Sequence, residues 1–317
     1  MKKFNYLITG GAGFIGTNIV HYLKNHANKI IIVDNLSTGK LKNVPNQENI
    51  KFYKIDLNNN LPDKIFKNID CIIHLAANAD IKDGFKNTKK DIYQNILATE
   101  NLLKKAVKFN IKDFIFSSTA AVYGEPKDYP TKEITAMPIQ TSLYGMSKLA
   151  AEGIFSSFTF NYGLRTSILR FVSILGDHYS HGHIIDFYKK ILNNKKKLLI
   201  LGNGFQKKSY LHVNDLVKAF DLLLKKKHFS KKSFFEIYNI GNNNFCTVNK
   251  SALIISKAMS AKPKFFYSGG RSGWQGDSPF VFLDINKISK LGWKPESNIL
   301  IAIKKTIQWL INEKNTN

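Results

Sequence analysis

The stretch Thr9-Gly10-Gly11-Ala12-Gly13-Phe14-Ile15-Gly16 decides how this chain of 317 residues folds. It follows an apolar run of strand length, Phe4–Thr9, and it opens a segment, Phe14–Asn25, with apolar residues at helical spacing. Glycines placed in this way bring a pyrophosphate close to the backbone and to the free N–H groups of the helix N-terminus. The stretch therefore predicts a dinucleotide-binding turn. The expected contacts to the dinucleotide are Gly10, Gly13, Phe14 and Ile15.

Alternating strand and helix signals continue through the first half of the chain. Strand-like runs are predicted at Lys29–Asp34, Ile50–Ile55, Cys71–Leu75 and Phe114–Ser117, and a long helix at Thr88–Phe109. Such alternation is typical of βαβ units, which form a parallel sheet covered by helices on both faces. We expect an α/β fold with a doubly wound parallel sheet of the Rossmann type.

The second half of the chain is less regular. Its predicted helices and strands are Leu143–Asn161, Thr166–Phe171, Ile184–Leu192, Leu198–Leu201, Asn214–Leu224 and Ile299–Ile311. We expect residues 1–170 to form the dinucleotide-binding domain, including the catalytic residues. Residues 171–317 are expected to form a smaller α/β lobe that mainly binds substrate, with some segments returning to the Rossmann sheet.

Two aspartates at strand ends indicate which dinucleotide is bound. Asp34 ends the second predicted strand, where a carboxylate can accept hydrogen bonds from both adenosine ribose hydroxyls and would repel a 2′-phosphate. We therefore expect NAD rather than NADP as the cofactor. Asp56 follows the third predicted strand and is expected near the adenine, although an aspartate there is also a common turn residue.

The composition excludes several classes of protein. The formal net charge is +24, but only three of the 47 basic residues are arginines and the lysines are scattered, so we expect a solvated lysine surface and no nucleic-acid partner. No apolar run reaches the length of a membrane span, so no membrane partner is expected. Cys71 and Cys246 give no disulfide framework, which makes the cytoplasm the default location. No metal site is expected.

The segment Tyr144-Gly-Met-Ser-Lys148 carries the expected chemistry. It places a tyrosine and a lysine four residues apart on a predicted helix, and therefore on one face. A nearby ammonium and the positive nicotinamide ring both favour a phenolate, so the pKa of Tyr144 is expected to fall towards the working pH. Such a tyrosine can take the proton from a sugar hydroxyl while a hydride passes to NAD.

With these residues in place, the chain resembles the extended short-chain dehydrogenase/reductase family, within its NAD-dependent nucleotide-sugar epimerase/dehydratase branch. The resemblance covers nearly the whole chain. It is carried by Val33-Asp34-Asn35-Leu36-Ser37-Thr38-Gly39, His74-Leu75-Ala76-Ala77, Asn95, Phe116-Ser117-Ser118-Thr119-Ala120-Ala121-Val122-Tyr123-Gly124, Tyr238-Asn239-Ile240-Gly241 and Leu291-Gly292-Trp293-Lys294-Pro295.

The resemblance implies a role for individual residues. Tyr144 is the base and Lys148 orients the nicotinamide ribose. Thr119 takes the place of the family's catalytic serine or threonine and binds the reacting oxygen, and Asn95 supports the lysine through water. The helix that carries Tyr144 is expected to pair with a second copy in a homodimer. Further implied contacts are Asn35, Ser37, Thr38, Leu57, Leu75, Ala76, Ala77, Ser117 and Phe171 for the cofactor, and Asn78 for the substrate.

Every member of this branch oxidises a sugar hydroxyl or runs the reverse reduction, and the later steps differ. The 4,6-dehydratases of the branch carry an acidic pair after the catalytic threonine, whereas this chain has Ala120 and Ala121, whose methyl groups cannot support elimination of water. Neither Cys71 nor Cys246 matches the extra acid/base pair of a 3,5-epimerase. A 4-epimerase acting on a UDP-sugar remains, as does a dehydrogenase or 4-ketoreductase acting at C4.

Four positions depart from the epimerase pattern in the substrate region. Ser173 stands where an asparagine contacts the sugar diphosphate, and Lys208 stands where an arginine binds phosphate. A second arginine position falls on Trp274, or on Arg271 after realignment. His183 begins a predicted helix whose N-terminus can meet a diphosphate.

The chain resembles a subgroup that is often labelled UDP-glucose 4-epimerase and that also contains enzymes oxidising C4 of a GDP-linked heptose. This resemblance is carried by Leu175-Gly176, His181-Gly182-His183 and Gly273-Trp274-Gln275-Gly276-Asp277. The sequence does not separate a UDP-linked from a GDP-linked sugar. A non-catalytic NAD-binding regulator on the same fold is a third class, and the intact Thr119, Tyr144 and Lys148 argue against it.

Overall fold

The computed structural model describes residues 3–81, 83–135, 139–227 and 232–316. The chain divides into two compact units. The first unit contains residues 1–122, 142–170 and 217–238, and the second contains residues 123–141, 171–216 and 239–317. Each unit is described by itself.

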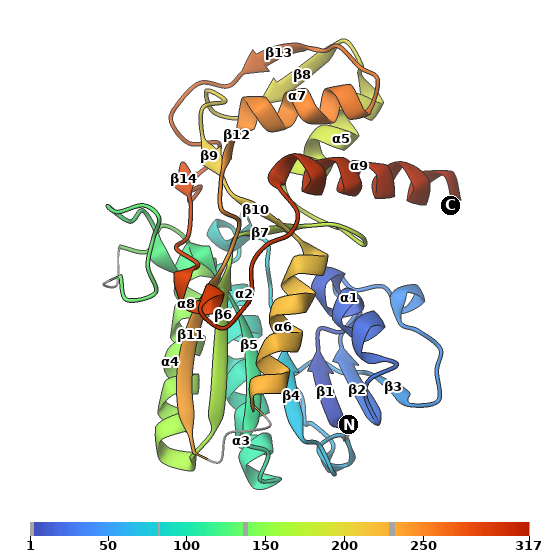
Figure 1. The fold of residues 1–317 in the computed structure, drawn as a ribbon, viewed down its shortest axis with the longest axis vertical. Helices are drawn as coiled ribbons and strands as arrows, with labels where there is room; N and C mark the ends of the chain where they lie inside the picture. Colours follow the sequence, from blue (N-terminus) through green and yellow to red (C-terminus); the bar gives the residue numbers. More distant parts are fainter. Residues whose placement is uncertain (1–2, 82, 136–138, 228–231, 317) are drawn as a thin grey trace. The chain divides into compact units, whose positions relative to one another are not determined.

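A seven-stranded sheet forms the centre of the first unit, in the order β11-β6-β5-β4-β1-β2-β3 (Figure 1). The pairings of β1 with β2 and β4, of β2 with β3 and of β4 with β5 are parallel. The predicted doubly wound Rossmann sheet is therefore confirmed. The strands are β1 (Asn5–Thr9), β2 (Lys29–Asp34), β3 (Ile50–Lys54), β4 (Cys71–His74), β5 (Asp113–Thr119), β6 (Arg165–Phe171) and β11 (Phe234–Ile240).

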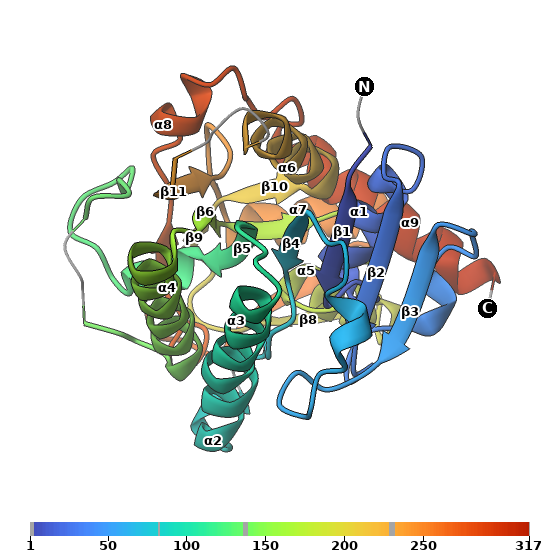
Figure 2. The same cartoon turned by 90° about the horizontal axis from the view of Figure 1, so that it is seen from below.

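The central strands form because their β-branched and aromatic residues are covered on both faces of the sheet. Leu7, Ile31 and Phe114 are all at most 1% exposed and belong to one apolar cluster. Figure 2 shows α3 and α4 on one side of the sheet and α1 and α6 on the other. The helices of this sheet are α1 (Phe14–Leu23), α2 (Thr88–Asp91), α3 (Ala98–Lys108), α4 (Leu143–Tyr162) and α6 (Val213–Lys227), with short 3-10 turns η1 (Leu41–Asn43), η2 (Asp63–Ile65), η3 (Asp83–Phe85) and η5 (Ala120–Tyr123).

The helix predicted over Thr88–Phe109 is interrupted by a different helical geometry. Between α2 and α3 lies a π-helical segment, η4 (Ile92–Leu97). A π-helical turn holds more residues than an α-helical one, so it changes which side chains face inwards. Asn95, in the middle of this segment, is 2% exposed.

The second unit contains short strands and four helices among its described residues. Its elements are β7 (Ser173–Leu175), α5 (His183–Asn193), β8 (Lys197–Ile200), β9 (Lys207–Lys208), β10 (Tyr210–His212), β12 (Cys246–Thr247), α7 (Val248–Ala258), β13 (Lys264–Tyr267), β14 (Phe280–Val281), α8 (Asn286–Ser289) and α9 (Ile299–Thr316). The sequence did not predict α7 or the strands other than β8. No helix in the described part of the chain is both long and apolar enough to cross a membrane.

Candidate active site

The glycine turn joins β1 to α1 and leaves the N-terminus of α1 open. Gly10 has φ +70°, and a Cβ there would lie 2.7 Å from the backbone nitrogen of Ala76. A Cβ on Gly16 would lie 2.1 Å from the carbonyl oxygen of Gly10, so this glycine lets helix and strand pack closely. Gly13 caps α1 without a side-chain hydrogen bond, and its own Cβ would meet only the Gly10 oxygen, at 3.3 Å. No side chain therefore caps the N-terminus of α1, and the backbone N–H groups of a helix end of this kind can bind a phosphate.

Asp34, at the end of β2, is bound to the same turn. Its Oδ2 accepts a hydrogen bond from the backbone N–H of Ala12 at 3.0 Å, and its Oδ1 accepts one from that of Leu36 at 2.8 Å. The residue is 8% exposed, and each oxygen keeps a lone pair for a ribose hydroxyl. Ser37 and Thr38, which follow in the loop, are exposed.

Asp56 and Asn35, two predicted cofactor contacts from different loops, are hydrogen-bonded to each other. The Asn35 Nδ2 donates to Asp56 Oδ2 at 2.8 Å, and Gln94 from η4 donates to the same oxygen at 3.1 Å. Burial works to raise the pKa of Asp56, but these bonds and one from the backbone of Asn58 outweigh it and lower that pKa. Gln94 was not identified from the sequence. Leu57, the next predicted contact, is 4% exposed and belongs to the apolar core.

A buried histidine connects the ends of β1 and β4. The Nδ1 atom of His74 is hydrogen-bonded to Thr9 Oγ1 at 2.7 Å, and its Nε2 atom is hydrogen-bonded to Thr99 Oγ1 at 2.9 Å. Complete burial, with a smaller effect of Lys148, lowers the pKa of His74 to about 3, so the ring is neutral. The Thr9 hydroxyl also accepts hydrogen bonds from the backbone N–H groups of Leu75 and Ala76. These bonds fix the backbone of Leu75 and Ala76, two of the three residues predicted to line the cofactor site.

Asn95 ties the loop after β4 to the helix that carries Tyr144. Its Oδ1 accepts from the backbone N–H of Asn78 at 2.8 Å, and its Nδ2 donates to Ser147 Oγ at 2.8 Å. Asn78 in turn donates from Nδ2 to the fully buried carboxylate of Asp91 at 2.8 Å. The structure therefore brings Asn78 and Asn95 together through direct bonds, and it adds Ser147 and Asp91, which the sequence analysis missed.

The structure brings the side chains of Tyr144 and Thr119 together, and the acidity of Tyr144 differs from the expectation. A hydrogen bond joins the two side chains and favours the phenolate. Burial and the nearby Asp91 carboxylate outweigh it and raise the pKa of Tyr144 to about 12. The expected fall of this pKa is therefore wrong for the chain without cofactor, because burial and Asp91 both disfavour a second negative charge.

Lys148 presents a buried ammonium that is suited to a ribose. The residue is 2% exposed, and its Nζ lies 4.1 Å from the centroid of the Phe116 ring. No hydrogen bond from this Nζ to another described residue is found. Burial lowers the pKa of Lys148 to about 7, and the carboxylate of Glu152 opposes that fall. A buried donor group of this kind, in the same unit as the glycine turn and the Asp34 carboxylate, fits a nicotinamide dinucleotide.

Lys208 and Trp274, two predicted diphosphate contacts, meet within the second unit. The Lys208 Nζ lies 6.0 Å from the Trp274 ring centroid and forms an ion pair with Asp277 at 2.6 Å. It also donates to the carbonyl oxygen of Ser278. Asp277 was not predicted, and it partly neutralises the charge that a phosphate would meet. Arg271 is 78% exposed at its side chain and pairs with Glu125 at 3.2 Å.

The remaining predicted site residues differ in their burial and in their hydrogen bonds. His183 begins α5 as predicted, and its ring is hydrogen-bonded to Ser251 Oγ and Tyr210 OH, both at 3.0 Å, so it ties α5 to α7 and β10. Ser173 begins β7 and is exposed. Phe171 ends β6 and is half-buried. Ser117 donates from Oγ to the carbonyl oxygen of His74 at 3.1 Å.

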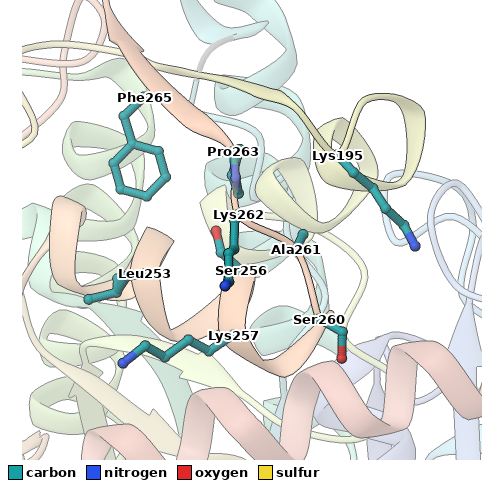
Figure 3. Close-up of a pocket in the computed structure, with 9 residues that line it drawn as sticks. All are labelled: Lys195, Leu253, Ser256, Lys257, Ser260, Ala261, Lys262, Pro263 and Phe265. Atoms are coloured by element: carbon teal, nitrogen blue, oxygen red, sulfur yellow. The ribbon is translucent and has the colours of Figure 1, made fainter.

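A pocket of about 760 Å³ in the second unit contains none of these residues (Figure 3). It lies at the C-terminal end of α7, where Lys257 is in the last helical turn, and Lys195 and Lys262 also line it. Lysines at a helix C-terminus complement its exposed carbonyl groups. No group of three or more His, Cys, Asp or Glu side chains able to hold a metal occurs among the described residues.

The glycine turn, Asp34 and the trio Thr119, Tyr144 and Lys148 all lie in the first unit, and together they have the chemistry that an NAD-dependent oxidoreductase needs. The model of the NAD dependent epimerase/dehydratase family matches residues 6–241. The chain belongs to this family and is an NAD-dependent enzyme.

Individual relatives match along almost the whole chain. A putative UDP-glucose 4-epimerase of Methanocaldococcus jannaschii is 34% identical over 98% of this chain and 99% of its own length. The UDP-N-acetylglucosamine 4-epimerase of Methanobrevibacter ruminantium, solved with UDP-N-acetylmuramic acid, is 32% identical with a TM-score of 0.87, covering 99% of this chain and 100% of its own. The UDP-glucose 4-epimerase of Thermus thermophilus, solved with NAD, is 28% identical with a TM-score of 0.84, covering 97% and 99%.

Proposed function

We propose that this enzyme is a 4-epimerase that acts on a UDP-linked sugar. The observation that carries the proposal is the contact between Thr119 and Tyr144, with Lys148 one helical turn further along α4. The two residues after Thr119 are Ala120 and Ala121, which cannot eliminate water from a sugar. Similarity to UDP-sugar 4-epimerases over almost the whole chain supports the same conclusion.

The described side chains divide the work of the reaction. Thr119 holds the oxygen on C4, and Tyr144 takes the hydroxyl proton when the sugar is oxidised and returns it when the 4-keto sugar is reduced. Lys148 donates hydrogen bonds to a ribose and supplies positive charge that lowers the pKa of Tyr144 from its cofactor-free value. The residues of the first unit named below would hold NAD, which would supply a group that can accept the hydride from C4 and return it.

The cofactor is held by residues of the first unit. The open N-terminus of α1 binds the pyrophosphate, Asp34 binds the adenosine ribose, and Asn35 and Asp56 border the adenine. Within the second unit, we assign the sugar diphosphate to Lys208 and Trp274, with Ser173, His183 and Arg271 as further contacts. A lysine gives the phosphate a point charge without the bidentate geometry of an arginine.

The test is to incubate the purified enzyme with UDP-glucose, UDP-N-acetylglucosamine, UDP-glucuronate and GDP-linked sugars, and to follow C4 by NMR. Inversion at C4 of a UDP-sugar without net NADH supports the proposal. A 4-keto sugar released in step with NADH, or turnover of a GDP-linked sugar alone, contradicts it and supports a C4 dehydrogenase. Binding of NAD with no turnover of any sugar would favour a regulatory protein.

We also propose that the enzyme is a homodimer that pairs through the α3 and α4 side of the sheet. That side exposes large apolar side chains: Tyr93 is 52% exposed, Leu97 43% and Phe160 91%. Sedimentation velocity should show a dimer, and Leu97→Glu should weaken it. A wild-type monomer at micromolar concentration contradicts the proposal. The two free cysteines are compatible with the cytoplasmic location that we propose.

A further inference from the structure

A buried ion pair lies one helical turn beyond Lys148, on the same helix. Glu152 is 3% exposed and Arg170, on β6, is 7% exposed. The Arg170 guanidinium holds the carboxylate from two directions, with Nε 3.0 Å from Oε1 and Nη2 2.6 Å from Oε2. Neither residue belongs to the machinery described above, and the family's known roles for Tyr144, Lys148 and Thr119 do not need them.

A third residue, on another strand, completes the arrangement. Ser118, on β5 and 1% exposed, donates from its hydroxyl to Oε1 of Glu152. Ser118 precedes Thr119, so Glu152 connects the helix that carries Lys148 to the strand end that carries Thr119. Arg170 connects the same carboxylate to the next strand. Three elements are thus joined at a single side chain that is out of contact with water.

We propose that Glu152 is a positioning residue for the cofactor: it fixes the Lys148 turn of α4 against β5 and β6, and its negative charge keeps the Lys148 ammonium charged when NAD binds. The carboxylate lies four residues after Lys148, and therefore on the same side of the helix. An ammonium forms stronger hydrogen bonds to ribose hydroxyls than a neutral amine does.

The other groups named here around Lys148 do not keep its ammonium charged. His74, on β4, is neutral because burial lowers its pKa to about 3. Arg170 is positive and opposes a charged lysine. Tyr144 is protonated without cofactor, and Asp91 acts mainly on Tyr144. Phe116 contributes only the face of its ring. Burial alone lowers the pKa of Lys148 and Glu152 raises it, so this carboxylate decides the charge near neutral pH.

The test measures binding of NADH, whose nicotinamide ring is neutral, to cofactor-free protein across about pH 5.5 to 9. In a plot of the logarithm of the NADH affinity against pH, the slope should change at the Lys148 pKa of the free protein, about 7 in the wild type. This change of slope is called the bend. In Glu152→Gln the bend should move to lower pH, with roughly tenfold weaker binding at neutral pH and unchanged binding at the acid end.

Two further variants keep the test decisive. Glu152→Gln leaves the buried Arg170 without this carboxylate, so it is compared with Glu152→Gln/Arg170→Leu, whose bend should lie between those of the single variant and the wild type. Asp113→Asn is the matched control, because Asp113 pairs with Arg165 at the opposite ends of the same strands, β5 and β6. Its bend should not move. A bend at the same pH in all proteins, or binding weakened equally at every pH, would overturn the proposal.

Discussion

The carboxylate of Asp34 and the backbone N–H of Ala12 are joined by a hydrogen bond of 3.0 Å, which ties the end of β2 to the glycine turn. The contact places the residue that is suited to the adenosine ribose at a fixed distance from the residues that are suited to the pyrophosphate. In the roles proposed above for Asp34 and the glycine turn, cofactor choice and phosphate binding are linked through this hydrogen bond, whose carboxylate is only 8% exposed.

Asp34→Ala should weaken NAD binding by about tenfold or more and should raise the affinity for NADP relative to NAD, because the repulsion of a 2′-phosphate is removed. Titration calorimetry with both dinucleotides measures the change. Asp70→Ala is the control, because Asp70 also accepts a backbone hydrogen bond, from Asn5 at the opposite end of the sheet. An unchanged preference for NAD in Asp34→Ala would show that the carboxylate does not choose the cofactor.

Tyr144→Phe should lower the turnover number by roughly a hundredfold or more while NADH still binds, since only the acid/base group is removed. Steady-state kinetics and an NADH titration separate the two effects. Tyr162→Phe, at the exposed end of the same helix, should leave both unchanged. Near-normal turnover in Tyr144→Phe would disprove the assigned role.

Asp91→Asn should lower the pKa of Tyr144 below its value of about 12 in the cofactor-free enzyme, because a nearby negative charge is removed while the hydrogen bond from Asn78 can remain. The phenolate absorbance of Tyr144 is obtained as the difference between each protein and the same protein carrying Tyr144→Phe. If the titration of Tyr144 stays where it is, the carboxylate of Asp91 does not act on it.

Gly13→Ala should weaken NAD binding, whereas Gly16→Ala should lower the stability of the fold. The Gly13 methyl group meets only the Gly10 oxygen, at 3.3 Å, so the protein should fold and lose affinity for NAD. The Gly16 methyl group would lie 2.1 Å from that oxygen, so helix α1 cannot stay in place and the melting temperature should fall by several degrees or more. Thermal melts and NAD titrations distinguish these outcomes, and equal melting temperatures would contradict the packing argument.

The neutral, buried His74 should make the protein sensitive to acid. Its folded-state pKa of about 3 lies below the unfolded value of 6.5, so the unfolded chain binds the proton first. The free energy of unfolding should therefore decrease as the pH falls from 6.5 towards 3, by about 1.4 kcal/mol per pH unit from this group. His74→Asn should show a flatter decrease in urea titrations. Parallel curves for the two proteins would exclude this contribution.

The features that the sequence predicted are those with local causes. The β-branched run Ile30-Ile31-Ile32-Val33 forms a buried central strand whatever its neighbours are. The glycine turn is defined by steric contacts within a few residues, and Tyr144 and Lys148 share a face because helical spacing requires it. NAD and the Rossmann sheet follow from these local patterns.

The features that escaped prediction depend on partners distant in the sequence. The strand β11 is half-buried along its first four residues, so it lacks a clear apolar run. The pairs Glu152 with Arg170 and Lys208 with Asp277 form only after the chain folds. The pKa of Tyr144 was mispredicted for the same reason, because the burial of the phenol and the position of Asp91 are tertiary properties.

The π-helical segment Ile92–Leu97 sets the rotational phase between two parts of one helical rod. Each residue of an α-helix turns the chain by about 100°, so one residue more or fewer in this segment rotates everything beyond it by that amount. Asn95, within the wide turn, is hydrogen-bonded to Ser147, while Leu102, Leu103 and Ala106 of α3 belong to the apolar core. A single-residue deletion here would therefore disrupt either the hydrophobic packing of α3 or the hydrogen bond from Asn95 to the catalytic helix.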